Sequence, residues 1–208
     1  MRDYELSSLL AARLCHDLAG SIGAVENGLD LVRELDGHGV SAEMEMVAQS
    51  ASRASLQLQF IRLAFGRTVM GNEPVARQQL SETVTGFLTG PRVRVEWSGT
   101  RGAALAAPLA RLIALVALCA RSCLGMSGML RCKLAPDHDH PIMIAAESPS
   151  IRVSDELLLW ITTPSDCTTL PEPRHVEFAL VEGASHAAGM KVIPETVPGK
   201  VSFLLEPV

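Results

Sequence analysis

The sequence predicts an α+β protein in which an antiparallel helical hairpin precedes a layer of helices and strands. Apolar residues recur every three or four positions between residues 14 and 65, as on amphipathic helices. After residue 71, short alternating runs typical of strands are interspersed with further helical patterns. The chain has 208 residues, 48% of them hydrophobic, enough for one large or two small domains and for a substantial buried core. We therefore expect two domains, residues 1–70 and 71–208.

The first two predicted helices each carry one apolar stripe. The first is expected to begin near Asp3 and Glu5 and to stop near Gly37. After a short loop, Ser41 is the expected N-cap of the second. The first stripe comprises Leu14, Leu18, Ile22, Val25, Leu29 and Val32. The second comprises Val47, Ala51, Ala54, Leu58, Ile61 and Phe65.

A short loop between two helices makes them antiparallel neighbours. One hairpin by itself cannot cover both stripes. Two copies that pair across a twofold axis can bury them in a four-helix bundle. We therefore expect a homodimer.

A linker at residues 66–74 leads to the mixed part of the chain. Helices are expected at 77–88, at 108–124, near Ser154, and at 173–188 before Gly189. Strands are expected at 92–97, 129–135, 141–146, 190–194 and 200–206, and the last two are joined by a turn at Pro198-Gly199. In the first strand, alternation places Val93, Val95 and Trp97 inward.

The apolar stretch at residues 103–120 has the minimum length of a membrane span. Pro108 and Arg111 favour a central helix buried on several sides, with a span as the alternative. The N-terminus, MRDYELSSLL, lacks the pattern of a signal peptide, so we expect a cytoplasmic protein without membrane contact. A net charge of −5 without a basic stripe argues against nucleic-acid binding.

The sequence offers little for metal binding. Its cysteines are odd in number and lack CxxC spacing, which favours reduced, packed thiols over disulfides or zinc: Cys15, Cys119, Cys123, Cys132 and Cys167. The tract Asp137-His138-Asp139-His140 is read as a solvated turn, with a metal site as the alternative. His175 and His186 have no obvious partners, and no GxSxG nucleophile elbow occurs.

His16 lies on the opposite side of the first helix from its stripe, about 160° away on a helical wheel. Other residues expected on this face are mostly small: Leu9, Ala12, Ala19, Gly20, Gly23 and Asn27. Two glycines inside a helix cost about 1 kcal/mol each relative to alanine. They are consistent with space cleared for another protein's backbone beside the ring. The alternatives are an ordinary surface histidine and glycines that serve tight packing.

Two charged residues accompany His16. Asp17 either orients the imidazole or is only a solvated charge. Arg13, one turn earlier, either offsets the charge of a phosphoryl group or pairs with Asp17.

The segment LCHDLAGSIGAVENGLDLV, residues 14–32, resembles the phospho-accepting helix of histidine kinases, with the core His16-Asp17-Leu18. It is most similar to the ChpT-type histidine phosphotransferases of alphaproteobacterial phosphorelays, with their C-H-D-L motif and a following N-G-[LV]-[DE]-L segment, here residues 27–31. The order of elements along the whole chain agrees. Ser21 replaces the proline that usually follows the kinase histidine by five residues.

The resemblance implies that residues 71–208 form a degenerate histidine-kinase-like ATPase domain, an α/β sandwich. Such a kinase domain needs an asparagine-bearing helix, a DxGxG loop and glycine-rich phosphate loops. The chain has asparagine only at Asn27 and Asn72, and no DxGxG occurs. The region that corresponds to the DxGxG loop reads TTPSDCTTLPEP. The segment GASHAAG at 183–189 is at most a degenerate glycine-rich loop. We therefore expect no binding of Mg²⁺-ATP.

The resemblance implies a phosphotransferase without autokinase activity. His16 would accept a phosphoryl group from the receiver domain of a hybrid histidine kinase and pass it to the receiver aspartate of response regulators, with Mg²⁺ held by the receiver. The chain itself would bind no cofactor or metal. Two alternatives remain. One is a non-catalytic kinase-like dimer that inhibits a kinase or regulator, and the other is an autophosphorylating kinase that binds nucleotide.

Overall fold

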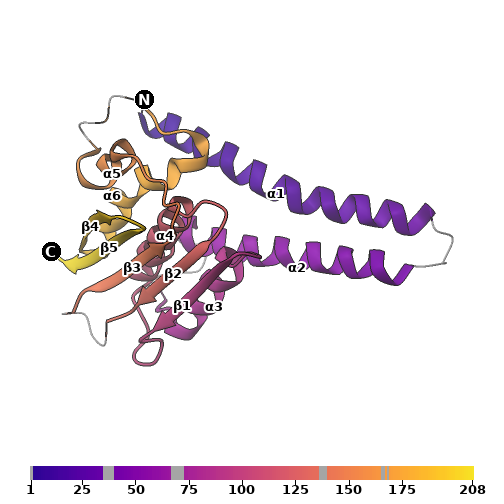
Figure 1. Ribbon diagram of the computed structural model, residues 1–208, viewed down its shortest axis with the longest axis horizontal. Coiled ribbons are helices and arrows are strands. Elements are labelled where there is room, and N and C mark those ends of the chain that lie inside the picture. The colour runs from indigo at the N-terminus through magenta and orange to yellow at the C-terminus, as the bar shows by residue number, and fades with distance from the viewer. Residues whose placement is uncertain (1, 35–39, 67–72, 136–139, 165–166, 168) are drawn as a thin grey trace.

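The computed structural model describes residues 2–34, 40–66, 73–135, 140–164, 167 and 169–208. Helices α1 (Arg2–Glu34) and α2 (Val40–Phe65) form an antiparallel hairpin. Figure 1 shows that one end of this hairpin lies against the rest of the molecule, whereas the other end projects away from it. The N-terminal half of α1 is therefore the half that lies beside the α/β part.

The α/β part contains one mixed sheet of five strands. Its elements are α3 (Arg77–Leu88), β1 (Val93–Ser98), α4 (Ala107–Cys123), β2 (Gly128–Lys133), β3 (Ile142–Glu147), α5 (Asp155–Thr162), the 3₁₀ turn η2 (Pro173–His175), α6 (Val176–Ala188), β4 (Met190–Val197) and β5 (Lys200–Pro207). The strand order is β1-β2-β3-β5-β4. Among the described residues, the β1–β2 pair is parallel and the other neighbouring strand pairs are antiparallel. Burial alternates along β1, β2 and β5, so one face of the sheet is covered and the other is open.

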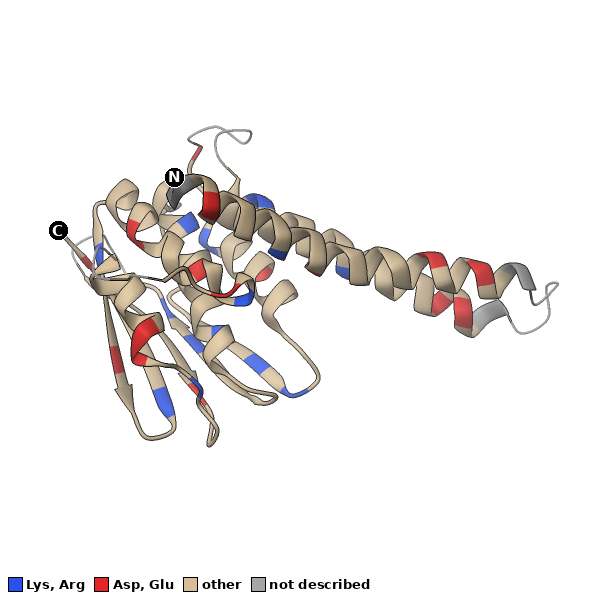
Figure 2. Ribbon diagram, turned by 90° about the horizontal axis from the view of Figure 1, so that it is seen from above, with Lys and Arg blue, Asp and Glu red and all other residues tan. Residues whose placement is uncertain are grey.

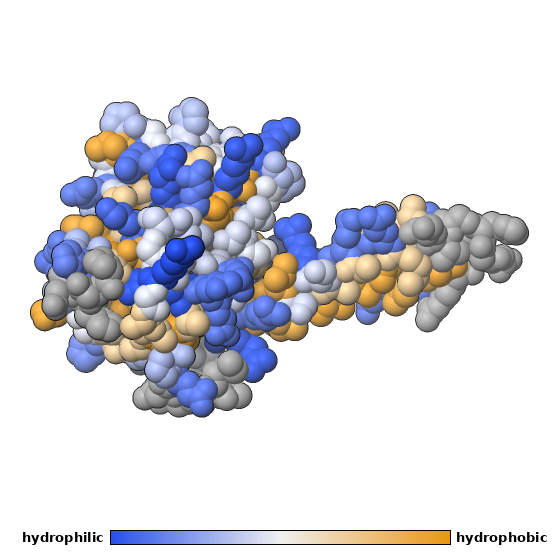
Figure 3. Space-filling view, turned by 90° about the horizontal axis from the view of Figure 1, so that it is seen from below, coloured by the Kyte–Doolittle hydropathy of each residue, from blue (hydrophilic) through white to orange (hydrophobic). Residues whose placement is uncertain are grey.

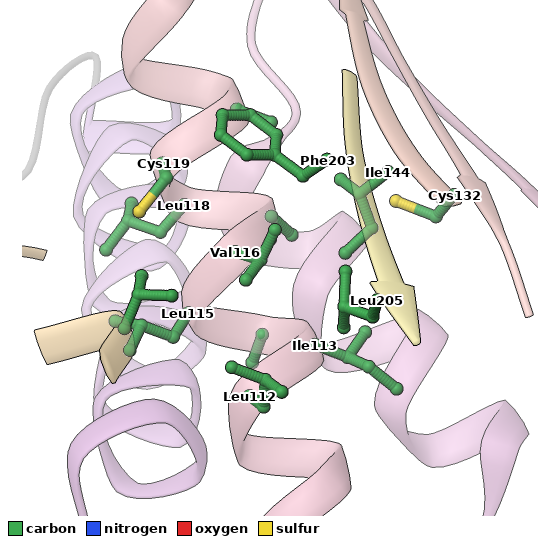
Figure 4. Close-up of a cluster of buried hydrophobic side chains, with 14 of the residues drawn as sticks. Leu112, Ile113, Leu115, Val116, Leu118, Cys119, Cys132, Ile144, Phe203 and Leu205 are labelled. Atoms are coloured by element: carbon green, nitrogen blue, oxygen red, sulfur yellow. The ribbon is translucent and has the colours of Figure 1, made fainter. Parts of the chain in front are cut away.

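Helix α4 is the centre of the hydrophobic core. Every residue from Leu112 to Ala120 is buried, and the helix packs against β2, β3 and β5 on one side and against α2 and α6 on others. Figure 4 shows Ile113 and Val116 beside the strand residues, with Leu115 and Leu118 directed away from them. A helix covered on several sides has to be apolar all round. The prediction of a buried central helix at 108–124 is thus confirmed, and no described helix is long and apolar enough to cross a membrane.

Most predicted elements agree with the structure within one or two residues. Ser154 caps α5 by accepting from the backbone N–H of Leu157, and Gly189 ends α6 in the left-handed conformation. One expected cap is wrong: α2 already begins at Val40, so Ser41 is not its N-cap. Residues 173–175 form a 3₁₀ turn and not the first turn of α6. Gly37, with nearly all of the hairpin loop and most of the expected linker, falls outside the described residues.

The two hairpin helices meet along a narrow seam. Gly28 is buried there, and a Cβ built on it would lie 2.5 Å from Cγ2 of Val47. The predicted stripes are only partly covered within one chain, because Ile22, Leu29 and Leu58 remain 50%, 38% and 47% exposed. Apolar side chains follow one face of the projecting hairpin in Figure 3. The single chain therefore leaves an apolar hairpin surface open to solvent.

Candidate functional site

The imidazole of His16 projects from α1 into solvent, with 88% of its side chain exposed. A Cβ added at Gly20 or Gly23 would meet none of the described atoms within 4 Å. Tight packing within the chain is therefore not the reason for these two glycines. Ala12 and Ala19 are exposed as well. The face of α1 around the ring is consequently open, as the helical wheel predicts.

Asp17 lies between the ring of His16 and the guanidinium of Arg13. Its Oδ1 is 3.3 Å from Nδ1 of His16, and its Oδ2 accepts a hydrogen bond of 2.7 Å from Nε of Arg13. The Arg13 and Asp17 side chains are 19% and 26% exposed. Such an aspartate can accept from Nδ1–H and leave Nε2 of the neutral ring without a proton. The carboxylate of Asp17 therefore lies within reach of both the imidazole of His16 and the guanidinium of Arg13.

The same guanidinium reaches across to α6. Nη1 of Arg13 lies 3.3 Å from Oε2 of Glu177 and also donates to the backbone oxygen of Arg174. Glu177 is only 1% exposed, and its Oε1 accepts from the hydroxyl of Ser122 on α4. Burial raises the pKa of Glu177, and the positive charge of Arg13 and the Ser122 hydrogen bond oppose that rise. A line of polar contacts thus links His16 to two helices of the α/β part.

A cleft beside His16 separates the hairpin from the α/β part. Its lining includes Asp17 and Gly20 of α1, Gln57 of α2 and residues 89–91, which join α3 to β1. Among the described lining residues, five are arginines and Asp17 is the only acid; the arginines are Arg13, Arg53, Arg121, Arg152 and Arg174. Figure 2 shows that the acidic positions of the projecting hairpin gather toward its free end. The cleft beside the ring is therefore positive and suited to an acidic partner surface.

A polar contact joins α1 and α2 on the C-terminal side of His16. The hydroxyl of Ser21 donates to Oε1 of Gln57 over 3.1 Å, and Gln57 is 5% exposed. Helix α1 runs without interruption through Ser21, the position of the proline in ordinary kinases. This bond holds α1 and α2 in register one to two turns from His16.

The expected contact residues divide into two groups. Arg13 and Gly20 line the cleft together with His16 and Asp17. The others lie elsewhere on the same helix face: Leu9, Ala12, Ala19, Gly23 and Asn27. Asn27 is exposed but sits about 16 Å from His16 along the helix axis, given a rise of about 1.5 Å per residue.

Sequence reasoning missed the residues that the α/β part contributes. Glu177 is the clearest case, since a lone acid inside the apolar run Val176-Glu177-Phe178 needs a buried partner. That signal identifies Glu177 as unusual, although it does not name Arg13 as the partner. The cleft arginines Arg121, Arg152 and Arg174 have no local signal at all.

The other candidates do not form a second site among the described residues. All five cysteines are free thiols, and burial raises the pKa of Cys123 and Cys132 to about 12. The burial of Cys119, Cys123 and Cys132 confirms their expected role in packing, whereas that expectation is wrong for Cys15, which is exposed, and Cys167 is only half-buried. No described group of His, Cys, Asp or Glu is arranged to hold a metal ion, and residues 136–139 of the acidic-histidine tract fall outside the description. His175 lines the cleft and packs edge-on against Phe178, and its pKa is lowered, first by burial.

Comparison with known proteins agrees with this geometry. The model of the histidine phosphotransferase C-terminal domain matches residues 77–196, more than half of the chain. The chain is 28% identical over 155 residues to the protein phosphotransferase ChpT of Brucella abortus (strain 2308). This alignment covers 74% of this chain and 73% of that protein.

A solved structure of a bacterial phosphotransferase shares the fold. Its TM-score is 0.78 at 23% sequence identity, and the match covers 98% of this chain and 96% of that one. The resemblance drawn from residues 14–32 is thereby confirmed at the level of the family. The chain belongs to the histidine phosphotransferase family and is a ChpT-type phosphotransferase.

Proposed function

We propose that His16 is the phospho-accepting residue and that the protein relays phosphoryl groups between receiver domains. The observation that carries this assignment is the exposed ring held by Asp17 at Nδ1. With Nδ1 donating to Asp17, the lone pair of Nε2 points away from the helix and is the nucleophile.

The transfer is a displacement at phosphorus. Nε2 of the neutral ring attacks the aspartyl phosphate of a receiver, the N–P bond forms, and the P–O bond to the aspartate breaks. The aspartate leaves as a carboxylate, and the imidazole, which keeps its Nδ1 proton, becomes a cation. The carboxylate of Asp17 stabilises that cation. The reverse attack by a second receiver aspartate completes the relay.

The receiver is the partner that suits the cleft. A receiver presents an acidic pocket around its phosphorylated aspartate, and the cleft arginines offer the complementary charge. The open face at Gly20 and Gly23 admits a partner's backbone close to the ring. Magnesium and the receiver's own lysine come with the partner, since transfer through a loose transition state needs chiefly positioning and neutralised charge.

A relay protein of this kind does not need to bind ATP. The helix that carries the asparagine of kinases corresponds to α4, and here all its residues from Leu112 to Ala120 are apolar and buried. The first polar residues beyond that run, Arg121 and Ser122, bond to neighbouring groups of this chain. We expect a calorimetric titration with Mg-ATP to give no heat of binding.

The assignment also includes two domains, residues 1–70 and 71–208, and a homodimer. The exposed Ile22, Leu29 and Leu58 supply an apolar face that a second hairpin would cover. The His16 face points elsewhere on α1, so such a dimer would leave both rings accessible.

The deciding experiment compares His16→Gln with His186→Gln, which removes another exposed histidine far along the sequence. Each variant is incubated with a phosphorylated receiver domain. We expect acid-labile label on the wild type and on His186→Gln, and none on His16→Gln. Label retained by His16→Gln would overturn the assignment.

Binding must be measured on the same variants. Equal receiver affinity of His16→Gln and wild type, with transfer lost, supports the relay. If the wild type binds receivers but never accepts label, the non-catalytic inhibitory module is the correct description.

A further inference from the structure

Glu177 is the most deeply buried carboxylate on the described part of the chain. Its two oxygens face different elements: Oε1 accepts from Ser122 of α4, and Oε2 pairs with Arg13 of α1. A buried carboxylate is expensive unless it is paired and hydrogen-bonded. Glu177 and Arg13 are 164 residues apart in the chain, so this pairing exists only in the folded molecule.

Arg13 uses two nitrogens for two carboxylates. Nε binds Asp17 at 2.7 Å, while Nη1 reaches Glu177 and the backbone oxygen of Arg174. The guanidinium is planar and rigid, so its contacts on the α6 side determine where Nε can lie. Nε in turn determines where the carboxylate of Asp17 lies relative to Nδ1 of His16, now 3.3 Å away.

We propose that Glu177 is a positioning residue for phosphotransfer, which acts through Arg13 and Asp17 to hold the reactive ring of His16 in its Nδ1–H form. This inference rests on the proposed role of His16. In this proposal the α/β part contributes to phosphotransfer without binding nucleotide, because its buried Glu177 orients the nucleophile on the hairpin.

The charge of Glu177 is the property that matters. If it is removed, the guanidinium has only Asp17 as an anionic partner and draws that carboxylate away from the ring. Nδ1 then loses its acceptor, and the ring moves toward the tautomer mixture of free histidine. The ring remains exposed and intact, but less of it presents an unprotonated Nε2.

The test uses Glu177→Gln, which keeps the size of the side chain and one acceptor oxygen but removes its charge. Glu182→Gln is the matched control, because it removes one charge from an exposed position of the same helix. Arg13→Lys is the second variant, since an ammonium group keeps the charge but cannot bridge two carboxylates as a fork does. Unfolding curves and receiver binding establish that each variant is folded.

Two quantities are measured on the full-length protein. The first is the tautomer of His16, read from its imidazole ¹⁵N resonances at a pH of about 8 for every variant. The second is the rate of phosphoryl transfer at saturating receiver. We expect Glu177→Gln and Arg13→Lys to lose the excess of Nδ1–H and to slow transfer about tenfold, because misplaced reacting groups are costly. The double variant should be no slower than the slower single variant.

Three results would overturn the proposal. They are a His16 tautomer in Glu177→Gln equal to that in Glu182→Gln, slower transfer without a tautomer change, and additive losses in the double variant. If Glu177→Gln does not fold, Arg13→Lys alone decides by the same two readouts. The tautomer is read without any phosphoryl transfer, so failure of this proposal is separable from failure of the His16 assignment.

Discussion

At the scale of single residues, the surroundings of His16 combine openness on one side with fixed contacts on the other. A Cβ at Gly20 or Gly23 would meet no described atom within 4 Å, whereas Asp17 contacts the ring of His16 and Arg13 contacts Asp17. A helix interior that accepts two glycines is less stable than one with alanines. The two glycines thus lower helix stability at the place where the proposed partner would approach.

Substitutions at Gly20 can distinguish an effect on the stability of α1 from an effect on partner access to His16. Since a Cβ there meets nothing within 4 Å, Gly20→Ala should raise the free energy of unfolding by about 1 kcal/mol. Gly20→Leu should also stabilise the helix but should reduce phosphoryl transfer strongly, because its side chain occupies the cleft. Denaturant unfolding and label transfer test both statements, with Ala187→Leu on α6 as the control. Wild-type transfer by Gly20→Leu would show that the space is not used.

Glu177 also predicts a pH dependence of stability. Its pKa is raised, first by burial, so between its ordinary and its native pKa the folded state binds more protons than the unfolded state. The contribution of this group to the free energy of unfolding is therefore full at low pH and declines as pH rises through the native pKa. As pH rises through the native pKa of Glu177, we expect the free energy of unfolding of the wild type to fall relative to that of Glu177→Gln. Parallel pH curves for the two proteins would contradict the prediction.

At the scale of elements, the hairpin depends on a close approach of its helices. Cγ2 of Val47 occupies the space where a side chain at Gly28 would begin. Ser21 and Gln57 add a partly buried hydrogen bond nearer to His16. These contacts, and not the predicted stripes alone, hold α1 and α2 together within one chain.

Gly28→Ala should therefore behave opposite to Gly20→Ala. Its methyl group would lie 2.5 Å from Cγ2 of Val47, a stiff β-branched side chain. Overpacking of about 1–3 kcal/mol outweighs the gain of about 1 kcal/mol in helix propensity, so the net effect is a lower free energy of unfolding. Val47→Ala in the same chain should restore most of the loss. A Gly28→Ala variant more stable than the wild type would show that the helices do not approach this closely.

At the scale of the whole molecule, the apolar face of the hairpin and the positive cleft are different surfaces. The α/β part covers one end of the hairpin and supplies Glu177 and most of the cleft arginines. The projecting end keeps its apolar side chains exposed in the single chain. Receiver docking and self-association are thus expected on different surfaces.

Charges introduced into the apolar face should make the protein monomeric. In a twofold interface each substitution acts twice, and losing the burial of a leucine costs about 1.5–3 kcal/mol. Leu29→Glu with Leu58→Glu should raise the dimer dissociation constant by more than about 100-fold. Light scattering across a concentration series measures it, with Met126→Glu, an 80% exposed position outside the hairpin, as the control. An unchanged dimer, or a monomeric wild type, would contradict the predicted interface.

Much of this molecule is predictable from the sequence because local periodicity determines local structure. The helical spacing of Leu14 and Leu18 places His16 on the opposite face of α1, and the alternation in residues 92–97 predicts a strand that the structure has as β1. The all-apolar run in α4 predicts a buried central helix. The motif around His16 also indicates the family.

The tertiary structure alone decides which distant residues meet. The strand order, the arginines that line the cleft and the contact between Arg13 and Glu177 join segments from opposite ends of the chain. Periodicity shows that Glu177 lies in an apolar helix and so needs a partner, but pairing across 164 residues depends on how whole helices pack. The sequence by itself places His16 on the surface of α1, whereas only the folded α/β part brings Glu177 to Arg13 and lines the cleft beside His16 with further arginines.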